Sequence, residues 1–124
     1  MTRWLLTAAW LVWLIVPLRA QTPTPTPSSF LTWDQPNVVS TAEAQAYTYQ
    51  YYADGATAGV AVTSVTCSGV APTVCRAPFP AFTPGSHTIT LTASNLAGTS
   101  PQSTLFTFTF VVVPSAPQNI RVGQ

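Results

Sequence analysis

Residues 29–113 alternate between apolar and polar side chains with a period of two, in short runs rich in Thr, Val, Tyr and Phe. Successive side chains of a strand point to opposite faces of a sheet, so this period is typical of strands that bury one face. Proline, glycine, asparagine and aspartate separate the runs, and turns are predicted at Asp54-Gly55 and Pro84-Gly85. The pattern predicts an all-β fold in which two antiparallel sheets pack as a sandwich.

The predicted strands cover 30–33, 46–52, 60–67, 75–82, 86–94 and 104–113. The run 75–82 contains prolines, which lack the amide hydrogen that a central strand donates, so it is predicted to lie at an edge or a bend. The nearest helical candidate, 41–46, is too short to affect the architecture.

Residues 1–20 have the order of a signal peptide: Arg3 near the start, an apolar run as far as Val16, then Pro17, and Ala20 as a small residue at the cleavage point. The run is shorter than the ~20 residues of a membrane-spanning helix. We expect cleavage after Ala20, with an uncleaved membrane anchor as the alternative. Export would place the protein outside the cell or on its surface.

Residues 21–28 form a Thr/Pro-rich linker whose centre, 22–27, reads TPTPTP. Alternating prolines fix φ and remove amide donors, which excludes this segment from helices and central strands. We interpret it either as a stiff spacer that holds a domain away from a surface or as a disordered leader that remains after cleavage.

Beyond residue 20 the charged side chains are Arg76, Arg121, Asp34, Glu43 and Asp54, so this part of the chain is close to neutral. Nucleic-acid binding needs a basic patch or stripe, and none is present, so a nucleic-acid partner is not expected. The two aspartates fall in predicted turns far apart along the chain, which argues against a carboxylate pair for glycoside hydrolysis.

Three segments carry a family resemblance: LTWDQP at 31–36, YTYQY at 47–51, and 82–95 with its Pro-Gly corner. They resemble the second, third and sixth strands of fibronectin type III domains, and the last is equally similar to bacterial immunoglobulin-like repeats. The resemblance implies a sandwich over 29–113 with these residues in the core or at a corner: Trp33, Tyr47, Tyr49, His87, Leu91 and Asn95. In two respects the chain departs from the family pattern. His87 replaces a corner tyrosine, and too few residues separate the proline tract from Trp33 for a normal first strand.

Cys67 and Cys75 are the only cysteines and enclose a short loop, 68–74. An even number of cysteines in an exported protein favours a disulfide, with free thiols as the alternative. A metal site would need further ligands, and the sequence contains a single histidine. We expect neither a metal nor another cofactor.

That histidine, His87, would have to serve in any serine–histidine–aspartate site. It lies on the side of Ile89 and Leu91 in a predicted strand, which favours packing or a corner hydrogen bond to the backbone over catalysis. We therefore expect no enzymatic activity.

In the last predicted strand, Phe106, Phe108 and Phe110 share one face. This face is predicted to enter the core. The alternative is that the long, uncharged strand lies at a sheet edge and pairs with another chain.

We expect a secreted, non-catalytic extracellular module that binds a protein or glycan, or spaces one from a surface, through loops or an edge strand. The alternative is a structural subunit that self-associates into a filament or surface layer. The tail, 114–124, resembles the linker and opening strand of a following fibronectin module. It is interpreted either as a remnant of a tandem ancestor or as a strand that completes the sandwich of the next molecule.

Overall fold

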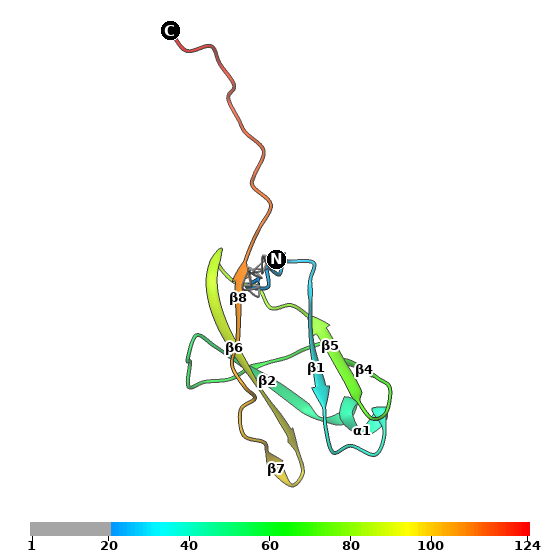
Figure 1. The fold of residues 1–124 in the computed structure, drawn as a ribbon. Helices are drawn as coiled ribbons and strands as arrows, with labels where there is room; N and C mark the ends of the chain where they lie inside the picture. The colour runs from blue at the N-terminus through cyan, green and yellow to red at the C-terminus, as the bar shows by residue number, and fades with distance from the viewer. Residues whose placement is uncertain (1–20) are drawn as a thin grey trace, which may run out of the picture.

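The computed structural model describes residues 21–124, and the predicted signal peptide lies outside this range (Figure 1). One sheet has the strand order β1-β5-β4. The other has the order β3-β2-β6-β7, with β8 also paired to β6. The bounds are β1 (Phe30–Gln35), α1 (Thr41–Ala46), β2 (Thr48–Ala53), β3 (Val60–Ala61), β4 (Thr66–Ser68), β5 (Thr73–Pro78), β6 (Gly85–Asn95), β7 (Gly98–Thr99) and β8 (Phe106–Phe110). Both sheets are antiparallel, and the predicted two-sheet sandwich is confirmed.

The long strand β6 organises the second sheet because it has neighbours along both edges (Figure 1). One edge pairs with β2, where Tyr51 lies opposite Leu91. The other edge pairs with β7 at one end and β8 at the other. Between them, the backbone N–H groups of Ser100 and Ser103 donate to the carbonyls of Ala93 and Leu91, and their hydroxyls accept from the N–H groups of those residues. Serine side chains thus continue the ladder between the two short strands.

Two apolar clusters fill the space between the sheets, and Trp33 of β1 packs against both. The first consists of Leu31, Phe79, Ile89, Phe108 and Phe110. The second consists of Ala44, Tyr49, Cys67 and Cys75. Phe108 and Phe110 are therefore core residues, as predicted for the last strand, whereas Phe106 keeps 41% of its surface exposed.

Two strand predictions need correction. The segment 60–67 is not one strand: it divides into β3 and β4, which belong to different sheets, and Ser64 takes a φ of 57° between them. The segment around β5 is not an edge strand, because β5 lies between β1 and β4. Pro78 is tolerated because it is the last residue of β5. The strand β4 begins at Thr66, opposite Arg76, and so does not extend far enough to need a hydrogen bond from Pro78.

The helix α1 forms, so the prediction that 41–46 would not matter is wrong. Its first turn is capped by Ser40, whose hydroxyl accepts from the N–H of Glu43, while the Glu43 carboxylate accepts from the N–H of Val39. Ala44 is fully buried against the second cluster. Tertiary packing therefore stabilises a helix that is too short to persist alone.

Candidate functional site

A groove of about 580 Å³ opens between the two sheets on the side of β1. Its walls are mainly apolar and come from β1, from β6, from β8 and from Phe79 after β5; residues 23–25 also line it, and serine and threonine hydroxyls are the polar groups of the lining. The apolar side chains that the strands contribute to these walls are Phe30, Leu31, Trp33, Ile89, Leu91 and Phe106, and no lining residue is charged. The groove therefore favours an uncharged, apolar occupant.

The rim of this groove is a strand edge without a neighbour, because among the described strands β1 pairs only with β5. The N–H of Phe79 donates to the carbonyl of Ser29. Hydrogen-bonded and non-hydrogen-bonded pairs alternate along an antiparallel ladder. The peptide groups that point away from β5 are therefore those of Phe30, Thr32 and Asp34. They form a row of donors and acceptors that an added strand could pair with.

The other strand edges of the described sandwich are short or covered. Beside β4, the side-chain oxygen of Gln45 in α1 accepts from the N–H of Cys67. Beside β8, carbonyls of the segment 23–25 accept from the N–H groups of Thr109 and Val111, at 2.9 and 3.1 Å. The strands β3 and β7 have two residues each. Native sheets usually protect their edges in these ways, so the six-residue edge of β1 is unusual in being open.

The covering of β8 also shows where part of the Thr/Pro-rich linker lies. Prolines cannot donate a backbone hydrogen bond, but their carbonyls can accept one. Residues 23–25 use this capacity along β8 instead of extending away from the sandwich.

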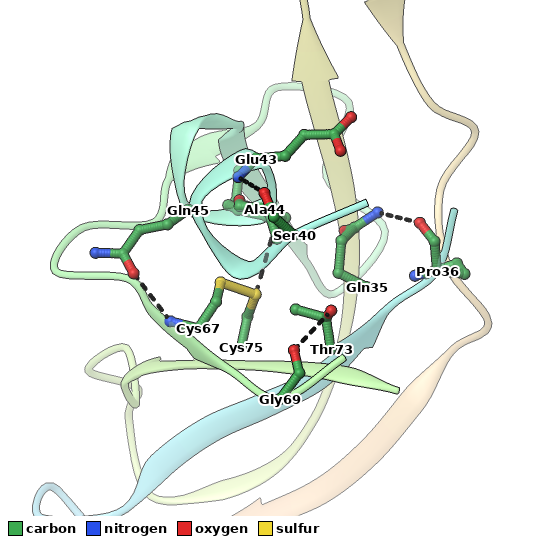
Figure 2. Close-up of a disulfide and its surroundings, with 11 residues drawn as sticks. Gln35, Pro36, Ser40, Glu43, Ala44, Gln45, Cys67, Gly69, Thr73 and Cys75 are labelled. Atoms are coloured by element: carbon green, nitrogen blue, oxygen red, sulfur yellow. Dashed lines mark hydrogen bonds between the residues drawn. A yellow bond between two sulfur atoms is a disulfide. The ribbon is translucent and has the colours of Figure 1, made fainter. Parts of the chain in front are cut away.

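The disulfide holds together the sheet that carries the open edge. Cys67 of β4 and Cys75 of β5 lie directly opposite each other, with Cα atoms 4.0 Å apart and their sulfurs at bonding distance, as predicted. Figure 2 shows the bond beneath α1, where Ala44 packs against it. Cys75 in turn lies opposite Trp33 of β1. The helix, the disulfide and β5 thus fix the position of β1 from one side.

His87 connects two corners of the second sheet. Its Nδ1 donates to the carboxylate of Asp54 at 2.8 Å, and its Nε2 donates to the carbonyl of Thr83 at 2.8 Å. The hydrogen bond from His87, followed by that from the N–H of Thr88, lowers the pKa of Asp54. The hydrogen bond to Asp54, followed by that to Thr83, raises the pKa of His87. Both ring nitrogens face acceptors, which favours the imidazolium and leaves no lone pair to take a proton from a nucleophile.

The residues that carry the family resemblance occupy different environments. Tyr49 is buried, and its hydroxyl donates to the carbonyl of Ala44 at 2.7 Å. Trp33 meets the Tyr49 ring edge-on at 4.9 Å. Tyr47 is not in β2 but follows α1, and its hydroxyl donates to Glu43. Leu91 is half-buried in the wall of the groove.

The remaining predicted position, Asn95, ends β6, and its side-chain oxygen accepts from the N–H of Ala97 in the turn to β7. Asp34 lies in β1, not in a turn as predicted, and it is exposed at the open edge. The groove was not among the features predicted from the sequence. A signal existed, since too few residues separate the proline tract from Trp33 for a strand that would cover β1.

The described range, 21–124, contains no helix long and apolar enough to cross a membrane. It also contains no group of three or more histidine, cysteine or acidic side chains arranged to hold a metal ion. Comparisons with protein-family models, with curated proteins and with solved structures give no match for this chain. The resemblance to fibronectin type III and immunoglobulin-like domains therefore stays a prediction.

Proposed function

We propose that the protein is a secreted, non-catalytic binding module of the fibronectin type III or immunoglobulin-like kind, and that it binds an extended polypeptide along β1. The observation that carries the proposal is the open edge of β1 beside the apolar groove. An extended peptide can add a strand to such an edge through main-chain hydrogen bonds, while alternate side chains enter the adjacent groove.

The chemistry of the groove favours a polypeptide over a glycan. A strand edge offers N–H and C=O groups at the spacing of another backbone, and the groove walls are apolar and uncharged. A sugar has no backbone that could match this spacing, and its hydroxyl groups would lie mainly against apolar walls, which is unfavourable. No catalytic step is part of the proposal, because both ring nitrogens of His87 are already engaged.

Amide hydrogen exchange provides a residue-level test. The protein would be purified from the exported fraction of a secreting host, where intact mass also tests cleavage after Ala20. The probe is a synthetic peptide of alternating valine and threonine with a lysine at each end. Binding should slow exchange at Thr32 and Asp34, whose amides point to the open side. Leu31 and Trp33 serve as internal controls, because their amides already face β5.

Slower exchange at the two outward amides alone would support strand addition. Unchanged exchange along β1 of monomeric protein, even at a large excess of the peptide, would refute the proposed function.

A further inference from the structure

We infer that the strand that occupies this groove is the tail of a second copy of the chain, with residues 118–122 added to β1. This inference rests on the proposed function and names its partner. Ile120 and Val122 enter the groove, while Arg121 points to the outer face of the sheet. The product is a head-to-tail assembly in which each molecule donates its tail and accepts that of a neighbour.

The tail has the side-chain pattern that the groove requires. Residues 111–124 form no helix or strand, and Figure 1 shows them running away from the sandwich. Ile120 and Val122 are β-branched and expose 91% and 92% of their surface. In an extended strand they lie on the same face, separated by Arg121 on the other. Two apolar side chains spaced in this way match a groove lined by Leu31 and Phe106.

Charge on the outer face is complementary as well. Asp34 lies exposed on the open edge of β1, and Arg121 is the basic residue of the tail. Within 21–124, neither makes a salt bridge, and the guanidinium of Arg121 bonds only to the carbonyl of Asn119. A strand that directs Ile120 and Val122 inward would direct Arg121 outward, to the face on which Asp34 is exposed.

The tail is long enough to reach another molecule. Val111 is the last residue held to the sandwich by a backbone hydrogen bond, to the carbonyl of Pro25. At ~3.3 Å per extended residue, Ile120 can lie about 30 Å beyond it. Asn119 now has a φ of 53° and must become extended on binding. Asparagine tolerates both conformations better than most residues. Donation in one direction does not close on itself unless it forms a ring, so open chains are expected.

The first experiment measures self-association by sedimentation equilibrium over a concentration series. Wild-type protein should form dimers and longer species. The double variant Ile120→Asp/Val122→Asp should weaken association by about 100-fold or more, because two charges would have to enter an apolar groove. Ser115→Asp/Ala116→Asp is the matched control: it adds the same two charges to the exposed tail outside residues 118–122 and should change association by less than about threefold.

The second experiment separates donor from acceptor. Thr32→Pro removes an outward N–H from β1 without touching the hydrogen bonds to β5, and proline is tolerated at strand edges. Thr32→Pro keeps an intact tail but has a blocked edge. The double variant Ile120→Asp/Val122→Asp keeps an open edge but has a tail that cannot enter the groove. Each alone should be monomeric, and their mixture should form discrete heterodimers. Trp33 fluorescence checks the fold, and if Thr32→Pro is unfolded, Phe106→Asp blocks the groove instead.

A wild-type protein that stays monomeric at its highest soluble concentration would overturn the inference, and so would a mixture that forms no heterodimer. Persistent association after deletion of residues 114–124 would also overturn it. Failure here is distinguishable from failure of the proposed function. If the wild type is monomeric and the valine–threonine peptide still protects Thr32 and Asp34, the groove binds strands but the tail is not its partner.

Discussion

Replacing Phe108 by alanine should destabilise the sandwich much more than the same change at Phe106, although both residues lie on one face of β8. Phe108 is fully buried, and its ring meets those of Phe79 and Phe82 edge-on, each at 5.0 Å. Phe106 is 41% exposed and forms a wall of the groove. The two substitutions therefore compare a core position with a groove position in the same strand.

The expected magnitudes follow from burial. Truncating a buried phenylalanine to alanine removes its transfer free energy and leaves a cavity, which together cost about 3–5 kcal/mol. For a domain of this size, each kcal/mol lowers the melting temperature by roughly 4–8 °C, so Phe108→Ala should lower it by tens of degrees. For Phe106, which keeps 41% of its surface exposed, we expect a loss of about 1–2 kcal/mol.

Urea unfolding followed by tryptophan fluorescence measures both values. Three of the four tryptophans precede residue 20, so Trp33 is the sole reporter within 21–124, and it packs against the cluster that contains Phe108. Phe108→Leu is the conservative control and should retain most of the stability. If Phe106→Ala and Phe108→Ala lower the free energy of unfolding equally, our assignment of Phe108 to the core and of Phe106 to the wall of the groove would be refuted.

Two further predictions concern the disulfide and the histidine. Thiol labelling of denatured, unreduced protein should detect no free Cys67 or Cys75, and replacing both by serine should cost about 2.5 kcal/mol of unfolding free energy; two labelled thiols would contradict this. Because the pKa of His87 is raised and that of Asp54 lowered, their interaction stabilises the fold fully between the ordinary values of 3.8 and 6.5. That contribution is lost as the pH rises through the folded pKa of His87 or falls through that of Asp54. As the pH rises above 6.5, the melting temperature of the wild type should therefore fall, and that of His87→Gln should not. If the melting temperatures of the two proteins change with pH in the same way, the His87–Asp54 interaction does not contribute to this stability.

The alternation of side chains was enough to predict the sandwich, because a strand that buries one face leaves a period of two in the sequence. It located β6 and the buried face of β8 well. It failed for 60–67, where the apolar pattern continues while the backbone turns at Ser64 and changes sheets. It also failed for α1, because Ala44 becomes a core residue only when the disulfide hairpin lies beneath it.

The local features of this protein therefore follow from its amino-acid sequence: its strand-forming segments, its turns, the pairing of its two cysteines and its low charge. These depend on residues that are close along the chain or on composition alone. Which strand edges are covered depends instead on contacts between residues that are far apart along the chain. The linker reaches β8 across more than eighty intervening residues, from Pro23 to Thr109, and Gln45 reaches Cys67 from another element. An open edge is the absence of a long-range neighbour, and no local pattern records it. The groove beside β1 consequently appears only when both sheets are in place.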